Sequence, residues 1–181
     1  MQLAVAYDRS SDKEKALGHL FTLVDNYPEV TPHLALALSV EGRLAYQTGE
    51  LKRSRKALER FLKEDQDNKP PFSKSAPPLR TEVRYYLGWI NALENKLEEA
   101  AEHLESAISI GEETMPIVAG VFRGSLALIR AKQGDIEAAQ SLLSSGEPLV
   151  TSIPFEHGKF LCKKAHVHLI AGEREQAEGA L

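Results

Sequence analysis

The chain has 181 residues, of which 43% are hydrophobic and 27% charged, and its formal net charge at pH 7 is −4. This composition is typical of a globular protein with a substantial core, and an acidic chain without a Lys/Arg-rich block is a poor candidate for nucleic-acid binding. The single cysteine excludes an intrachain disulfide, and the sequence shows neither a signal-peptide pattern nor an apolar run long enough for a membrane span. We therefore expect a cytoplasmic protein without membrane contact.

Taken in chain order, the sequence alternates stretches of helical periodicity with five similar short turns. Their central residues, called anchors below, are Ser11, Gly49, Asn95, Gly134 and Gly172. Successive anchors are 38, 46, 39 and 38 residues apart. A turn that returns at a nearly constant interval, as in "AKQGDIEAAQSLL", indicates a repeated helical hairpin, called a copy below, rather than a single catalytic loop.

Three further positions recur at fixed distances from the anchors. A small residue stands seven positions before each anchor and another five positions after it, and a leucine stands nine positions after it. The small residues before the anchors are Ala4, Gly42, Gly88, Ala127 and Ala165. The small residues after the anchors are Ala16, Ser54, Ala100, Ala139 and Ala177, and the leucines are Leu20, Leu58, Leu104, Leu143 and Leu181. Small residues allow antiparallel helices to approach closely, and the leucines fill the space between hairpins, so the pattern predicts an all-α solenoid.

The residues at the turns explain why each helix stops and the next begins. Glycine or asparagine at an anchor can adopt the left-handed conformation that ends a helix. The acidic residues Asp12, Glu50, Asp135 and Glu173 follow four of the anchors. At the start of a helix a carboxylate can accept hydrogen bonds from free backbone N–H groups and meets the positive end of the helix dipole.

These columns resemble the tetratricopeptide repeat. The segment "YYLGWINALENKLEEAAEHLESAISI" carries Leu87–Gly88, Ala100, Leu104 and Ala107, and the first copy is similar, with Leu3, Ala4, Tyr7, Ala16, Leu20 and Pro28. The resemblance covers essentially the whole chain. It implies a right-handed superhelical solenoid of antiparallel helix hairpins, with about five repeats and incomplete terminal ones, in a single domain spanning residues 1–181.

The period is longer than the family's usual one of about 34 residues. Longer repeats of this kind look like those of large bacterial signalling proteins, where they adjoin kinase, cyclase, ATPase or DNA-binding domains, so a regulatory segment of such a protein is one implied function. Because the first and last copies are cut, we expect the chain to belong to a longer protein. Weak self-association is expected through exposed apolar residues at the cut ends, namely Leu3, Tyr7, Leu169 and Leu181.

Two details break the regularity of the copies. Residues 67–79 are rich in proline and explain the spacing of 46, so we expect a surface loop between copies two and three, with a docking loop or hinge as the alternative. Glu41 and Lys164 stand where other copies have leucine, which leaves the packing of copies two and five open.

No catalytic, cofactor or metal site is predicted. The sequence contains no GxxxxGK[ST], GxSxG or HExxH motif. Cys162 and His166 would share a helix face, but His168 would point elsewhere, and a metal site normally needs three or four converging ligands. An enzyme using Cys162 and His166 is the least favoured alternative.

The resemblance implies that the first helix of each hairpin lines a concave groove that binds a protein or peptide. The groove residues it implies are Arg43, Tyr46, Tyr85, Trp89, Leu128, Lys132 and His166. Tyr46, Tyr85 and Trp89 are the favoured contacts because aromatic side chains carry much of the binding energy at interfaces. The alternative is that Trp89 packs between helices and meets no ligand.

Overall fold

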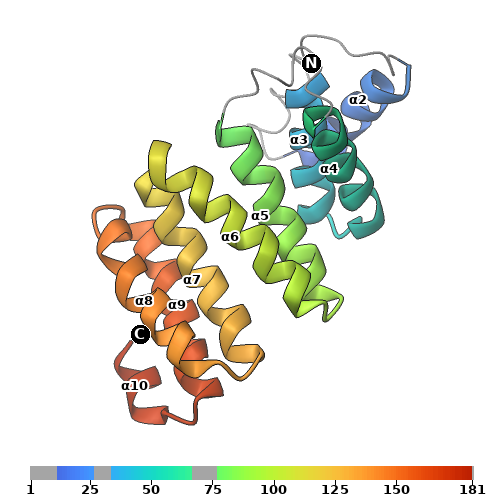
Figure 1. Cartoon of the computed structure of the whole chain (residues 1–181). Helices are drawn as coiled ribbons and strands as arrows, with labels where there is room; N and C mark the ends of the chain where they lie inside the picture. The colour runs from blue at the N-terminus through green and yellow to red at the C-terminus, as the bar shows by residue number, and fades with distance from the viewer. Residues whose placement is uncertain (1–11, 27–33, 67–76, 181) are drawn as a thin grey trace. The chain divides into compact units, whose positions relative to one another are not determined.

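A computed structural model of the chain describes residues 12–26, 34–66 and 77–180, and in these ranges the only regular secondary structure is helical. The helices follow one another as α2 (Lys13–Asn26), α3 (Leu34–Gln47), α4 (Leu51–Gln66), α5 (Pro77–Leu93), α6 (Leu97–Thr114), α7 (Pro116–Lys132), α8 (Ile136–Val150), α9 (Pro154–Ile170) and α10 (Arg174–Gly179) (Figure 1). The all-α helical-repeat solenoid expected from the sequence is confirmed.

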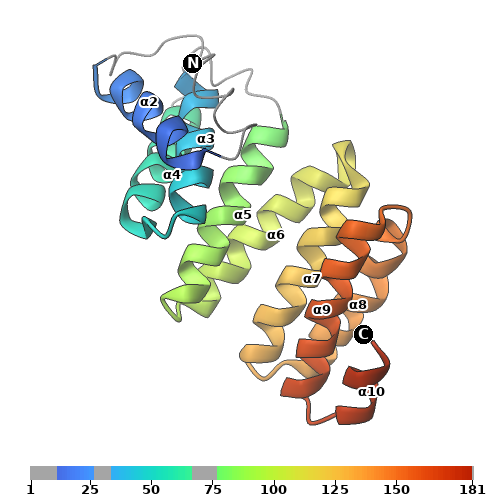
Figure 2. The ribbon, with the colours of Figure 1, turned by 180° about the vertical axis from the view of Figure 1, so that it is seen from behind.

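The chain divides into two compact units, Met1–Ile90 and Asn91–Leu181. In the first unit the apolar residues of α2, α3, α4 and α5 form one buried cluster. In the second unit α7 packs against α6, α8 and α9, and Figure 2 shows α9 beside α7 and α8. The single domain over residues 1–181 and the right-handed superhelical course stay predictions.

All four described anchors have the left-handed conformation that their residue types predict. Their φ angles are 83° at Gly49, 59° at Asn95, 88° at Gly134 and 78° at Gly172. The residue after each anchor donates its backbone N–H to the carbonyl five positions earlier, at 2.8 to 2.9 Å. This bond is part of the Schellman motif, so every described hairpin turn ends its first helix in the same way. Ser11 lies outside the described residues.

The acidic residues after the anchors cap their helices only where the side chain is short. Asp135 accepts a hydrogen bond from Ala138 N at 3.0 Å, and Asp12 accepts one from Lys15 N at 3.3 Å. The prediction is wrong for Glu173, which makes no cap bond at the start of α10. Its longer side chain reaches other helices instead, where it accepts hydrogen bonds from His168 Nδ1 at 2.7 Å and Gln140 Nε2 at 3.0 Å.

The small-residue columns form the closest contact between α3 and α4. Ser54 Oγ donates to the carbonyl of Gly42 at 2.6 Å. A Cβ atom at Gly42 would lie 2.2 Å from Leu58 Cδ2, so a larger residue here would require the Leu58 side chain to move. In copy two the residue seven before the anchor therefore contacts the residues five and nine after it. The small-residue contact is the predicted one, whereas Leu58, which was expected between successive hairpins, also contacts Gly42 of its own hairpin.

The second unit has a similar set of close contacts around α7. A Cβ at Gly120 would lie 2.8 Å from Leu149 Cβ and 3.0 Å from the carbonyl oxygen of Gly146. A Cβ at Gly124 would lie 2.7 Å from the ring of Phe160, which is fully buried. The two glycines thus give α7 room for α8 on one side and for the Phe160 ring of α9 on the other.

The proline-rich connection is shorter than predicted. Residues 77–79 form the first turn of α5 and not the end of a loop over residues 67–79. Proline is compatible with the first helical turn because the N–H groups there have no intrahelical acceptor. The rest of the segment, residues 67–76, lies outside the described residues.

Replacing Gly120 with alanine tests the α7–α8 contact. The new Cβ would overlap Leu149 Cβ and a backbone oxygen, neither of which can rotate away, so Gly120→Ala should destabilise the protein by about 1–3 kcal/mol. The matched control is Gly158→Ala in α9, where no atom lies within 4 Å of the new Cβ. That control should stabilise by up to about 1 kcal/mol, and urea unfolding measures both. Equal effects of the two variants would contradict the contact.

Replacing Gly134 with alanine tests the turn conformation. Nothing lies within 4 Å of a Cβ at Gly134, so any cost must come from the backbone at φ 88°. We expect Gly134→Ala to destabilise by about 1–2 kcal/mol, because an L-residue is strained in the left-handed region. Thermal unfolding followed by circular dichroism measures the effect, and a Gly134→Ala protein as stable as the parent would show that the turn can change its conformation freely.

Candidate functional site

Four aromatic side chains from α3 and α5 lie together in the first unit. The ring centroids of Tyr46 and Tyr86 are 5.2 Å apart, those of Tyr85 and Tyr86 5.4 Å, and those of Tyr85 and Trp89 6.3 Å. The two contacts of Tyr85 are edge-to-face, a favourable arrangement for aromatic rings. We call Tyr46, Tyr85, Tyr86 and Trp89 the aromatic cluster; all four are half-buried.

Charged and polar groups surround the aromatic cluster. Arg43, one turn before Tyr46, forms an ion pair with Glu82 of α5 in which Nε and Oε1 are 2.9 Å apart. Burial raises the pKa of Tyr86 to about 12, and the nearby Glu82 carboxylate adds to the shift. Burial also raises the pKa of Tyr46, with a smaller effect from Tyr85. Both phenols are therefore neutral at physiological pH and can donate hydrogen bonds.

The structure brings together Arg43, Tyr46, Tyr85 and Trp89 of the predicted groove residues. Tyr86 is not among the residues that the repeat resemblance implies, although it contacts both Tyr46 and Tyr85. The signal was present, since Tyr86 stands beside Tyr85 in the sequence and one turn after Glu82. What was missing is the pairing of α3 with α5, which a helical period does not specify.

The other predicted groove residues belong to the second unit. Leu128 in α7 is only 6% exposed, so in the free protein it is part of the core. Lys132 in α7 and His166 in α9 are exposed. Their role in binding stays a prediction, and so does self-association, for which Leu169 is 58% exposed while Leu3, Tyr7 and Leu181 lie outside the described residues.

A half-buried lysine in the second unit bridges two helices. Lys163 Nζ on α9 donates to Ser125 Oγ at 2.8 Å and to the Val121 carbonyl at 3.3 Å, both on α7. Burial lowers the pKa of Lys163 to about 8, with Glu156 opposing the shift. The two acceptors are neutral, so the ammonium connects α9 to α7 through hydrogen bonds, and no carboxylate in the described part of the chain forms an ion pair with it.

In the described residues, the potential metal-ligating side chains are not gathered at one place. Cys162 is a free, exposed cysteine. Over the described ranges, no three or more His, Cys, Asp or Glu side chains lie close enough to hold a metal ion. In the same ranges, no helix combines the length and apolar character that crossing a membrane requires.

The two charged residues that replace leucine in the repeat pattern each have an ion-pair partner. Arg53 Nε lies 3.1 Å from Oε1 of Glu41, which is only 5% exposed, and Lys164 Nζ lies 2.7 Å from Glu147 Oε2. The hydrogen bond from Lys164 lowers the pKa of Glu147. Since this carboxyl pKa is depressed, the pair stabilises the fold above the ordinary glutamate pKa and loses its effect as pH falls through the lowered value.

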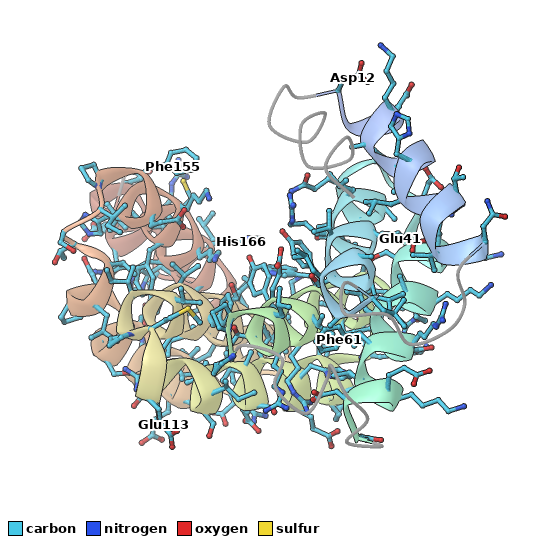
Figure 3. The ribbon with its side chains drawn as sticks, turned by 90° about the horizontal axis from the view of Figure 1, so that it is seen from above. Asp12, Glu41, Phe61, Glu113, Phe155 and His166 are labelled. Carbon is cyan, nitrogen blue, oxygen red and sulfur yellow. The ribbon has the colours of Figure 1, made fainter. Side chains whose placement is uncertain are left out.

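Each of these two charged side chains lies in a cleft between the second helix of one copy and the copy that follows it. Glu41 lies in a cleft of about 460 Å³ lined by α2, α3 and α4, and Figure 3 labels Glu41 on α3 and Phe61 on α4. Lys164 lies in a cleft of about 260 Å³ lined by α8 and α9. In both copies a charged side chain at the leucine position therefore lies in an open cleft. The sequence shows this position only as a departure from the repeat pattern.

Comparisons with known proteins identify the repeat. The tetratricopeptide repeat family model matches residues 39–113, which extend from α3 through most of α6. No curated protein sequence matches the chain. Similar solved structures include the nearly identical TPR-like repeats of a protein from Podosopora anserina assigned as a kinesin light chain, with a TM-score of 0.73, 16% identity, and coverage of 99% of this chain and 88% of that one.

A second similar structure is BtubC (BKLC) from P. vanneervenii. It has a TM-score of 0.57 and 14% identity, and the match covers 94% of this chain and 86% of that one. At these identities the likeness shows the fold alone. Together with the family match over residues 39–113 and the repeated Gly/Asn turns, it shows that the chain has a fold of tetratricopeptide-like helical repeats.

Proposed function

We propose that this chain is a non-catalytic scaffold that binds a peptide segment of a partner protein on the aromatic cluster. Tetratricopeptide repeats are generally protein–protein interaction modules. The observation that carries the proposal is the aromatic cluster itself, with Tyr46, Tyr85, Tyr86 and Trp89 half-buried beside Arg43. Tyr, Trp and Arg are the residue types that most often dominate the energy of protein interfaces.

The packing within the cluster suits it to binding. Each ring touches another ring, so the aromatic side chains are held in place before a partner arrives. A preorganised aromatic surface loses little conformational entropy when it binds, which leaves more of the interaction energy as affinity. The exposed part of each ring provides apolar contact area, and the phenols of Tyr46 and Tyr86 are neutral donors over the physiological pH range.

The Arg43–Glu82 ion pair adds a charged group with which the bound peptide can interact. Arg43 lies beside Tyr46 and is half-buried, with Glu82 as its partner. A carboxylate on the peptide could pair with the guanidinium in place of Glu82, because Arg binds carboxylates through two parallel hydrogen bonds. The support for a non-catalytic role is the lack of nucleotide-binding, serine-hydrolase and zinc-protease motifs in the sequence.

Trp89→Ala is the decisive variant. If Trp89 contacts the partner, the variant should weaken peptide binding by about 2 kcal/mol or more while the helical content stays unchanged. Binding peptides can be selected from a random-sequence peptide array probed with the parent protein. Because Trp89 is the only tryptophan, its fluorescence should also shift when such a peptide binds to the parent.

Phe155→Ala provides the matched control. Phe155 is an aromatic residue of α9 that is 71% exposed, so its loss should affect neither stability nor binding at the cluster. A Trp89→Ala protein that loses about 3–5 kcal/mol of unfolding free energy would show a core role for the indole and refute the binding assignment. Equal peptide affinity of the parent and Trp89→Ala would refute it as well.

A further inference from the structure

We infer that the cleft between α2, α3 and α4 is a second protein-binding site, and that it takes an acidic peptide segment with one apolar side chain. This inference is independent of the aromatic cluster, because none of the residues that line the cleft belongs to that cluster. It rests on three features of the cleft: a row of cations, the lack of an ion-pair partner for Lys52 and Lys56 in the described residues, and an apolar floor.

The cations come from one side of α4. Lys52, Lys56, Arg60 and Lys63 are spaced by four, four and three residues, so they form a stripe along one helix face. Helix α4 carries six Lys and Arg residues against three Asp and Glu residues, although the chain as a whole has a net charge of −4. Like charges one turn apart destabilise a helix slightly, and an anionic partner would remove that cost.

The stripe is only partly neutralised by neighbouring carboxylates. Arg53 pairs with Glu41 at 3.1 Å, and Arg55 pairs with Glu59 at 3.3 Å. Lys52 and Lys56 are exposed, and neither forms an ion pair with any residue in the described ranges. Both lysines line the cleft, so it presents two cations that are available to a ligand.

The remaining lining defines which kind of anion fits. Val24, Leu38 and Ala57 are core residues of three different helices, at most 7% exposed, and form the apolar floor of the cleft, while Lys52, Arg53, Lys56 and Arg60 contribute the positive charge. Glu50 also lines the cleft, and its Oε1 lies 3.5 Å from Thr48 Oγ1. Four cations against Glu41 and Glu50 leave the cleft positive. An acidic segment with one apolar side chain complements both the charge and the apolar surface.

The corresponding cleft of copy five shows what a self-neutralised site looks like. There Lys164 pairs with Glu147 at 2.7 Å, and His168 pairs with Glu173 at 2.7 Å, so its charged groups already have partners. The cleft between α2, α3 and α4 differs, because Lys52 and Lys56 have no ion-pair partner in the described ranges. A nucleic acid fits less well than a peptide, since the chain is acidic overall and the cation row covers only three turns of one helix.

The test measures fluorescence anisotropy with a fluorescein-labelled peptide of glutamates around a single leucine, at low ionic strength. Two further peptides replace all glutamates with glutamine or the leucine with serine. The Lys52→Glu/Lys56→Glu variant should bind the glutamate–leucine peptide about tenfold or more weakly than the parent, because two attractive contacts become repulsive. Both altered peptides should bind the parent more weakly.

The control variant is Lys96→Glu/Lys159→Glu, which changes the net charge by the same amount at exposed lysines outside the cleft. It should retain the affinity of the parent, and so should Trp89→Ala, which separates this site from the aromatic cluster. Equal losses in the two lysine variants would overturn the inference. The inference would also be overturned if the serine peptide bound the parent as tightly as the leucine peptide. A further contrary result would be that single-stranded DNA or phosphatidylserine vesicles bind the parent more tightly than the peptide and lose as much affinity in the Lys52→Glu/Lys56→Glu variant. Either result would indicate a general surface for polyanions.

Discussion

The close approach of neighbouring helices at residues with little or no side chain is the constraint on which this structure depends. Gly42 admits Leu58, Gly120 admits Leu149, and Gly124 admits the ring of Phe160, each at a distance that an added Cβ would prevent. Because protein interiors are closely packed, such a contact fixes both the separation and the rotation of the two helices. The face that each helix presents to solvent then follows from the contact on its opposite side.

The aromatic cluster and the two clefts are consequences of this packing. With Gly42 and Ser54 holding α3 against α4, the Arg43 and Tyr46 side of α3 is directed toward α5, where Glu82, Tyr86 and the other rings lie. Glu41 occupies the leucine position of the same helix and lies in the cleft lined by α2, α3 and α4. Neighbouring positions of α3 therefore serve three purposes: hairpin packing, a partly exposed aromatic surface and a charged cleft.

Ion pairs make the irregular copies compatible with the fold. A glutamate as buried as Glu41 would be costly alone, and its bond to Arg53 offsets part of that cost. Lys164 is accommodated in the same way by Glu147 of the preceding copy. Glu41 and Lys164 were visible in the sequence as departures from leucine. Their effect on the packing depended on ion-pair partners 12 and 17 residues away along the chain.

The sequence alone determined the all-α repeat, the turn positions and the columns of small residues, because these depend on local backbone conformation and on a period that five copies repeat. The resemblance to the tetratricopeptide repeat implied that Arg43, Tyr46, Tyr85 and Trp89 face one groove. Only the tertiary structure decided that Tyr86 joins them, that Leu128 is buried, and that Lys163 bonds to Ser125, 38 residues away. The physical reason is that burial and charge pairing depend on which faces of separate helices meet, and that choice reflects the packing of side chains from all of them together.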